Sequence, residues 1–165
     1  MEVKTVTRAD APLFRHYQLT DDDRRFTAHP RDTLDDFSID PERRHYAVVL
    51  EDQPEKPIGF FVLHGGETIK SFAYSDHSVL FRAFSIDHRE QGKGYGKAAM
   101  LQALEVAKRD YPEATEMVLA VNNGNHKAQS LYEKLGYLDQ GRTRMGPHGP
   151  QLLYYYPLKE PRAEG

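Results

Sequence analysis

The sequence predicts an α/β fold, with a mixed and mostly antiparallel central sheet of about seven strands and helices on both faces. Runs rich in β-branched and aromatic residues alternate with helical runs, and turns containing Pro or Gly separate them. The predicted strands are residues 2–8, 45–51, 57–65, 79–86, 116–121, 137–145 and 151–158. The predicted helices are residues 11–19, 32–39, 94–109 and 126–135.

The amino-terminal elements follow from local patterns. Residues 2–8 alternate polar and apolar side chains, which is typical of a half-buried strand. Asp10 and Pro12 suit the beginning of a helix over 11–19, because proline is tolerated in the first helical turn. Residues 20–31 are polar, and we expect a loop there.

The next three elements have clear boundaries. Pro41 ends the short helix 32–39, since proline cannot continue a helix. The turn between strands 45–51 and 57–65 is rich in proline and charge, which predicts a hairpin. Residues 66–77 are expected to form a polar loop or an irregular strand.

The carboxy-terminal half follows the same logic. Pro112 separates the long helix 94–109 from the strand 116–121. The strands 137–145 and 151–158 flank a Gly- and Pro-rich turn, so they are expected to form a terminal hairpin.

Composition narrows the class of protein. A chain of 165 residues and 18.9 kDa fits a single domain spanning 1–165. There is no Cys, so disulfides and thiolate metal sites are excluded, and the eight His show no helical ligand spacing, so we expect no metal. A net charge of −3 argues against nucleic acid as a partner. No apolar run is long enough for a membrane span and Met1–Asp10 is polar, so we expect no membrane partner and a cytoplasmic location.

The most informative stretch joins strand 79–86 to helix 94–109. It carries Gln91-Gly92-Lys93-Gly94-Tyr95-Gly96-Lys97, in which three glycines stand at alternate positions. Glycines let the backbone turn tightly, and the first helical turn has unpaired N–H groups and a positive dipole end. The stretch therefore predicts an anion site, most simply for phosphate. The P-loop and dinucleotide patterns do not fit this spacing.

A second motif follows strand 116–121. Asn125 is a candidate N-cap and Gly136 a candidate C′ residue for the helix 126–135. Asn125, Ala128 and Tyr132 share one helical face, where the small Ala128 leaves room beside Tyr132. The alternative is that Tyr132 belongs to an ordinary core stripe with its neighbouring leucines.

Taken together, the two motifs resemble the GNAT superfamily of acyl-CoA N-acyltransferases. The resemblance rests on Gln91-x-x-Gly94-x-Gly96 after a strand, and on Asn125, Ala128, Leu131, Tyr132, Gly136 and Tyr137 about thirty residues later. It implies a GNAT-like acyl-CoA N-acyltransferase fold, and it covers roughly residues 45–158.

The resemblance also implies roles. The backbone of residues 91–97 would hold the pyrophosphate of acetyl-CoA, the co-substrate. Phe84, Ser85 and Ile86 would pair with the pantetheine arm and direct an N–H at the thioester carbonyl. Asn125 would contact the pantetheine arm, and Tyr132 would protonate the departing thiolate.

The general base stays open. Some family members use a Glu on the strand before the glycine turn, but this strand carries Arg82, Ser85 and Asp87. Glu67, Asp76 and His77 are candidates acting through water, and each is also compatible with a solvated loop position. A single basic side chain is not required if the site desolvates the amine.

Acceptor specificity has two interpretations. Residues 21–40 hold an excess of acidic side chains, the seven Asp 21, 22, 23, 32, 35, 36 and 40 against the three Arg 24, 25 and 31. An anionic mouth would attract a cationic amine such as a polyamine. The other interpretation is a solvated face with carboxylates at helix starts. Phe26, Thr27 and the Tyr154–Tyr156 strand are candidates for the pocket wall or for the core.

The leading hypothesis is an enzyme that transfers the acetyl group of acetyl-CoA directly to a primary amine of a small cationic acceptor, with a polyamine first. Within the enzyme class, a peptide or protein N-acetyltransferase and an amino-sugar acetyltransferase are alternatives. A non-catalytic acyl-CoA-binding or sensing module is the competing class. Domains of this kind often dimerise, and the terminal hairpin offers an edge for a homodimer.

Overall fold

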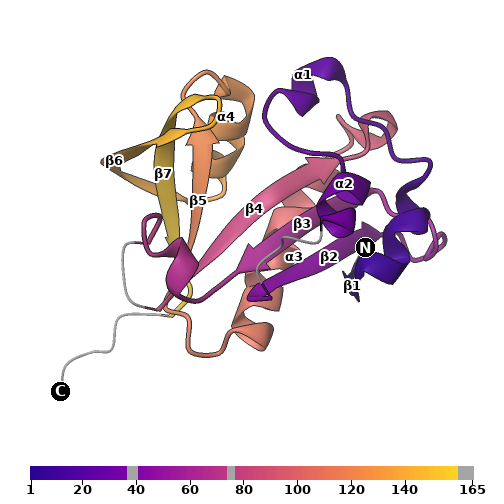
Figure 1. Cartoon of the computed structure of the whole chain (residues 1–165), viewed down its shortest axis with the longest axis horizontal. Helices are drawn as coiled ribbons and strands as arrows, with labels where there is room; N and C mark the ends of the chain where they lie inside the picture. Colours follow the sequence, from indigo (N-terminus) through magenta and orange to yellow (C-terminus); the bar gives the residue numbers. More distant parts are fainter. Residues whose placement is uncertain (37–40, 74–76, 160–165) are drawn as a thin grey trace. The chain divides into compact units, whose positions relative to one another are not determined.

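The computed structural model describes residues 1–36, 41–73 and 77–159 (Figure 1). These residues fall into two compact units. The first unit comprises Met1–His64 and Phe81–Ala103, and the second comprises Gly65–Leu80 and Leu104 onward. Residues 37–39 of the predicted second helix, together with Asp40 and Asp76, lie outside the described residues.

The first unit begins with strand β1 and a set of short helical segments. In chain order its elements are β1 (Glu2–Val6), η1 (Arg8–Phe14), α1 (Asp21–Arg24), α2 (Pro30–Asp35), β2 (Arg43–Val49), β3 (Gly59–His64), the end of β4 (Ser78–Ile86), η3 (His88–Glu90) and the start of α3 (Tyr95–Asp110). Antiparallel pairing joins β1 to β2 and β2 to β3.

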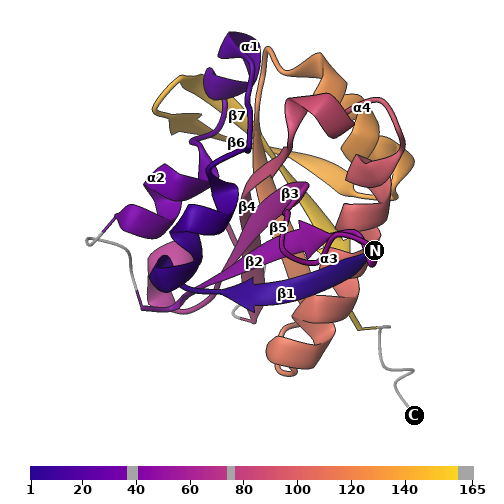
Figure 2. The same cartoon turned by 90° about the vertical axis from the view of Figure 1, so that its right-hand side faces the viewer.

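An apolar core holds the short helices of the first unit against its strands. Phe14, Tyr17 and Leu34 pack with Ala47 and Phe60, all of them buried. In Figure 2, α2 and the start of α3 lie on opposite sides of the strands β2 and β3. The helices expected on both faces of the sheet are therefore present in this unit.

The second unit is built on the β5–β7–β6 strands. Its elements are η2 (Glu67–Ile69), the start of β4, the end of α3, β5 (Glu116–Asn122), α4 (His126–Lys134), β6 (Leu138–Gly146) and β7 (Gly149–Pro157). The start of β4 pairs in parallel with β5, while β5–β7 and β6–β7 are antiparallel.

The strands follow one hydrogen-bonding order, β1-β2-β3-β4-β5-β7-β6, in a seven-stranded mixed sheet. Strand β4 contributes to both units. This confirms the predicted fold class, and the parallel pairing of β4 with β5 makes the sheet mixed.

Two amino-terminal predictions were wrong. The first helix was expected over 11–19, but a 3₁₀ helix runs from Arg8 to Phe14. Pro12 lies inside it and lacks an N–H, so the regular α-helical ladder cannot pass through this segment. Within the expected loop 20–31, Thr20 caps the short helix α1 by accepting a hydrogen bond from Asp23 N at 3.0 Å.

Among the described residues, no helix has the length and apolar character needed to cross a lipid bilayer.

Candidate active site

The end of β4 contains a distorted position. Ala83 has a φ of +54°, in the left-handed region that a residue with a Cβ rarely adopts. Outliers of this kind inside a strand re-aim the backbone and cluster at functional sites. The hydroxyl of the next-but-one residue, Ser85, lies 2.9 Å from the Tyr17 hydroxyl, and both side chains are buried. The Ser85 side chain is therefore turned toward Tyr17.

The buried Asp87 fixes the beginning of the turn that follows. Its carboxylate accepts hydrogen bonds from the Arg89 backbone N–H at 3.0 Å and from Arg89 Nη2 at 3.0 Å. The same Nη2 donates to the His16 carbonyl at 2.7 Å. Its hydrogen bonds to Asp87 raise the pKa of Arg89. The pair therefore ties the start of the turn to the segment after η1.

The side chain of Gln91 stabilises the turn through two hydrogen bonds. Its side-chain Nε2 donates to the Ile86 carbonyl at 3.0 Å and to Asp23 Oδ2 at 3.0 Å. The predicted site residue Gln91 therefore has a structural side chain, and it joins the end of β4 to α1.

The glycines of the turn are required by backbone conformation. Gly92 and Gly94 have φ values of +79° and +84°. A methyl group built on either would meet no atom within 4 Å, so steric crowding is not what selects glycine here. Instead the left-handed backbone does, and the open space lets a ligand approach the main chain closely.

The start of α3 supplies hydrogen-bond donors beside these glycines. The first helical bond runs from Ala98 N to the Gly94 carbonyl at 3.3 Å, so the N–H groups of Tyr95, Gly96 and Lys97 precede the ladder. Lys93 is exposed and pairs with Glu90 at 3.0 Å, and Lys97 is exposed as well. Backbone donors, the dipole of a 16-residue helix and two cations fit a phosphate group.

In the second unit, α4 begins as its motif predicts. Asn125 is the N-cap, and its side-chain oxygen accepts from Ala128 N at 3.3 Å. This leaves the side-chain NH2 group of Asn125 to serve a ligand. Gly136, with a φ of +98°, follows the helix end.

Tyr132 stands in an aromatic cluster within the second unit. Its ring contacts Tyr137 at 5.9 Å and Tyr154 at 6.5 Å between ring centroids. The Tyr154 hydroxyl in turn donates to Glu133 at 3.1 Å. Burial raises the pKa of Tyr132 to about 12, so its hydroxyl is protonated throughout the neutral range.

Two of the three candidate bases, Glu67 and His77, lie on exposed segments of the described chain. Glu67 forms an exposed ion pair with Lys70 at 2.9 Å. His77 is exposed, and its carbonyl accepts from Thr115 N at 2.7 Å. Asp76 lies outside the described residues. Glu67 is therefore engaged in a surface ion pair, whereas the contact at His77 is made by its backbone.

The acidic side chains at residues 21–23 stabilise the start of α1 or form polar contacts with neighbouring side chains. Asp21, Asp22 and Asp23 form the first turn of α1, where carboxylates stabilise the helix dipole. Asp22 pairs with Arg25 at 3.1 Å on the surface, and Asp23 holds Gln91. These contacts support the solvated-face interpretation for the described part of the segment.

Sequence reasoning missed the pairs Asp87–Arg89 and Tyr17–Ser85. Asp87 and Arg89 stand two residues apart just before the glycines, so their spacing offered a signal that the turn was clamped. The Tyr17–Ser85 contact spans 68 residues and has no local signature. Across the described ranges, no three His, Cys, Asp or Glu side chains gather as a metal site.

Comparison with known proteins places the chain in a family. A family model described as the acetyltransferase (GNAT) family matches residues 11–137. The chain is also 38% identical over 146 residues to the uncharacterized N-acetyltransferase YbbJ of Bacillus subtilis (strain 168), covering 88% of this chain and 89% of that protein.

Solved structures share the fold at low identity. A complex of AAC(6')-Ib with paromomycin and acetyl-CoA has a TM-score of 0.74 at 18% identity, covering 99% of this chain and 98% of that one. A spermidine N-acetyltransferase SpeG chimera from Vibrio cholerae and hSSAT has a TM-score of 0.67 at 18% identity, covering 96% of each chain. From the family match and the identity to YbbJ, the chain belongs to the GNAT family and is an acetyltransferase.

Proposed function

We propose that this acetyltransferase transfers the acetyl group of acetyl-CoA directly to a primary amine of a small cationic acceptor. The observation that carries the donor is the left-handed Gly92–Gly94 turn, which opens a long helix with unpaired N–H groups. The complexes of AAC(6')-Ib with acetyl-CoA or coenzyme A support the same donor for a chain of this fold.

The donor-binding residues are those of the turn and of the β4 end. The backbone N–H groups of residues 91–97 hold the pyrophosphate, with Lys93 and Lys97 adding positive charge. The backbone of Phe84, Ser85 and Ile86 binds the pantetheine arm beyond the distortion at Ala83, and Asn125 contributes its side-chain NH2 group. One N–H from Phe84–Ile86 stabilises the charge that develops on the thioester oxygen, a contribution of about 10²–10³ in rate.

Tyr132 donates a hydrogen bond and then a proton to the leaving sulfur. A pKa of about 12 keeps the donor protonated. A thiol has a pKa near 8.5, so complete transfer to a free thiolate would be uphill by roughly 5 kcal/mol. We therefore expect a strong hydrogen bond in the transition state, with the proton following as the C–S bond breaks.

The acceptor must arrive neutral or lose its proton in the site. An alkyl amine has a pKa near 10.4, so at neutral pH roughly one molecule in a thousand is neutral, a cost of about 4 kcal/mol. Because Glu67 forms a surface ion pair with Lys70 and the strand before the glycine turn carries no Glu, desolvation of the amine is the proposed source of the reactive form.

A polyamine is the first acceptor class to test, and an aminoglycoside the second. Structures of this fold include a spermidine N-acetyltransferase and complexes of AAC(6')-Ib with paromomycin and kanamycin. Asp21, exposed at the start of α1, supplies negative charge that would attract either polycation.

We further propose a single domain over 1–165, a cytoplasmic location and a homodimer, with neither nucleic acid nor membrane as a partner. The dimer rests on β6, the last strand in the sheet order, where Leu138 and Met145 are 46% and 72% exposed.

The test is thiol release from acetyl-CoA against spermine, spermidine, putrescine, aminoglycosides, amino acids and short peptides. Amine-dependent release with one preferred acceptor supports the proposal. If acetyl-CoA binds tightly by calorimetry and no amine releases thiol, the chain is instead an acyl-CoA-binding module.

A further inference from the structure

A row of three polar side chains crosses the strands β6, β7 and β5 of the second unit. Arg144 lies directly opposite Gln151, and Gln151 lies directly opposite Asn122. Directly opposed residues of antiparallel strands point to the same face of a sheet, so the three side chains stand side by side. Adjacent strands are about 4.8 Å apart, which brings the row within reach of one small molecule.

Arg144 is held in one orientation by two contacts. Its guanidinium lies over the Phe72 ring, 3.9 Å from the ring centroid, and its Nη1 donates to Gln151 Oε1 at 2.9 Å. Phe72 itself packs against the buried Ile69 and Val118. Arg144 is half-buried, and it forms no ion pair with a carboxylate in the part of the chain that the structure describes. A fixed guanidinium with further N–H groups suits the two oxygens of a carboxylate.

The amide of Gln151 depends on the absence of a side chain at Gly146. A Cβ built on Gly146 would lie 2.5 Å from Gln151 Cδ, so a larger residue would displace the amide. The amide oxygen accepts from Arg144, which leaves the NH2 group of Gln151 to donate. Gln151 therefore adds a second kind of donor beside the guanidinium.

Asn122 provides the opposite chemistry at the other end of the row. The residue is 7% exposed, and its side-chain oxygen is buried without a hydrogen-bond partner among residues 1–36, 41–73 and 77–159. A buried acceptor without a partner is destabilising, so this oxygen indicates a ligand that donates an N–H. An ammonium group is a strong donor of this kind.

The row points away from helix α4. Tyr154 of β7 contacts Tyr132 of α4, with 6.5 Å between the ring centroids. Gln151 stands three residues before Tyr154, and side chains alternate along a strand, so Gln151 points to the other face. An amine that attacks the thioester must approach from a side that the donor does not occupy. With the donor beside Tyr132, the row is placed for the acceptor.

We propose that this row binds the head group of an α-amino acid acceptor, with Arg144 on the carboxylate and Asn122 on the α-ammonium group. One carbon joins these two groups, so they fit within about one strand spacing. A diamino acid bound in this way keeps its side-chain amine for acetyl transfer, and its two ammonium groups leave it with a net positive charge. The inference rests on the proposed function and narrows the small cationic acceptor to a diamino acid.

Three probes separate the parts of this head-group site. L-Lysine carries both groups, 1,5-diaminopentane lacks the carboxylate, and 6-aminohexanoate lacks the α-ammonium group. Calorimetry in the presence of saturating coenzyme A measures each Kd without turnover. The wild type should bind lysine at least tenfold more tightly than either analogue, because a site built to bond a polar group rejects a ligand that lacks it.

Two variants assign the groups to their residues. Arg144→Gln should lower the affinity for lysine and for 6-aminohexanoate at least tenfold and leave that for 1,5-diaminopentane within twofold. Asn122→Leu should lower the affinity for lysine at least tenfold and leave that for 6-aminohexanoate within twofold. Thermal unfolding checks that each variant folds, and the comparison of the three probes in the wild type needs no variant.

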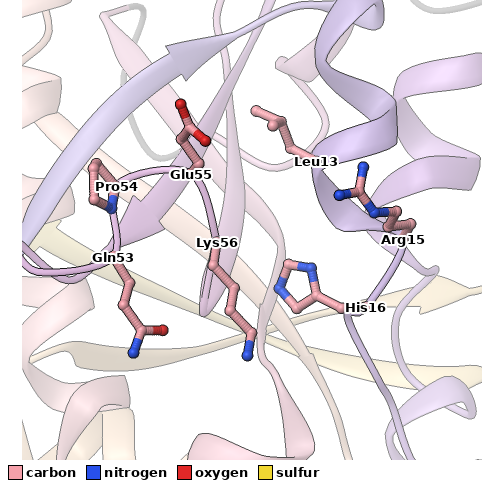
Figure 3. A pocket seen from close by; sticks show the side chains of 7 residues that line it. All are labelled: Leu13, Arg15, His16, Gln53, Pro54, Glu55 and Lys56. Carbon is pink, nitrogen blue, oxygen red and sulfur yellow. The ribbon is translucent and has the colours of Figure 1, made fainter.

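Arg15→Gln is the matched control. Arg15 is exposed beside a cavity of about 830 Å³ in the first unit, where its head group and that of Lys56 point in different directions (Figure 3). Its replacement should leave all three affinities within twofold of wild type.

Equal affinities of the wild type for lysine and 1,5-diaminopentane would overturn the proposal, as would parallel losses for all three probes in Arg144→Gln. Acetyl transfer to a polyamine without any preference for lysine would leave the proposed function standing and remove this site.

Discussion

Tyr132 carries the proposed acid chemistry, and its surroundings keep its hydroxyl protonated. The rings of Tyr137 and Tyr154 pack against it, and burial raises its pKa to about 12. A tyrosine in this state holds its proton across the working pH range, which a donor to a leaving sulfur requires. The packing also fixes the ring, so the hydroxyl does not need to be ordered on binding.

Tyr132→Phe should lower kcat by about 10²–10³ while changing the Kd for acetyl-CoA by less than about threefold, because it removes a proton donor and little volume. Steady-state kinetics and calorimetry measure the two quantities. Tyr111→Phe, at the end of α3, is the matched control and should change neither. Parallel losses in kcat and in binding would mean that Tyr132 only packs.

Arg89→Gln tests the clamp before the glycine turn. The substitution removes the guanidinium group from the Asp87 carboxylate, whose side chain is 3% exposed. Of the hydrogen bonds between the two residues, the one from the backbone N–H of residue 89 then remains. Since Arg89 itself is 43% exposed, solvent screens its contact with Asp87, and we expect a lower urea midpoint but not a loss of folding. Urea denaturation checks this, with Arg31→Gln on α2 as control. An unchanged unfolding midpoint would show that the clamp contributes nothing.

The turn from β4 into α3 depends on its glycines more than on its charges. Gly94 has open space but a left-handed φ of +84°. Its replacement is therefore a test of backbone conformation that is free of steric overlap.

Gly94→Ala should destabilise the protein by about 1–2 kcal/mol, because alanine does not adopt a left-handed backbone readily. Gly124→Ala is the control, since Gly124 also has open space and its φ is not positive. Thermal unfolding compares the two. Gly94→Glu should in addition abolish acetyl-CoA binding through bulk and negative charge, and wild-type affinity in that variant would refute the donor site.

Element type was predictable wherever the local pattern was strong. The capping signals around Asn125 and Gly136 gave α4 within one residue, because a cap is a local hydrogen bond. The segment from Arg8 to Arg24 was harder. There Pro12 and the Thr20 cap acted against the apolar spacing, and short 3₁₀ and α segments resulted.

The sequence predicted the glycine turn and Tyr132, but not the long-range contacts around the candidate site. The glycine turn and Tyr132 are carried by local motifs. The distortion at Ala83, the Tyr17–Ser85 contact and the bond from Arg89 to the His16 carbonyl depend on residues far apart in the chain. No local pattern encodes such contacts, since they arise only when the strands and helices pack.

Four tyrosines with raised pKa values make the stability of the protein depend on alkaline pH. Burial raises the pKa of Tyr17, Tyr132, Tyr137 and Tyr154. An unfolded tyrosine ionises near pH 10, so the unfolded state loses protons first and stability falls as pH rises above that value. Tyr132 alone should account for about 1 kcal/mol at about pH 11.

Urea denaturation at a series of pH values between about 8 and 11.5 measures this loss. Tyr137→Phe should reduce the slope above about pH 10, because it removes one ionising group and keeps the apolar ring. A stability that stays constant to about pH 11 would contradict the assigned burial.

The most direct measurement of acetyl transfer follows both products of one reaction. Thiol released from acetyl-CoA and N-acetylated amine would be quantified together, with spermidine and an aminoglycoside as acceptors, for the wild type and Tyr132→Phe. The proposed function predicts the two products in equal amounts for one acceptor class, with a rate about 10²–10³ lower in Tyr132→Phe. Thiol release without acetylated amine, or equal rates in the two proteins, would contradict it.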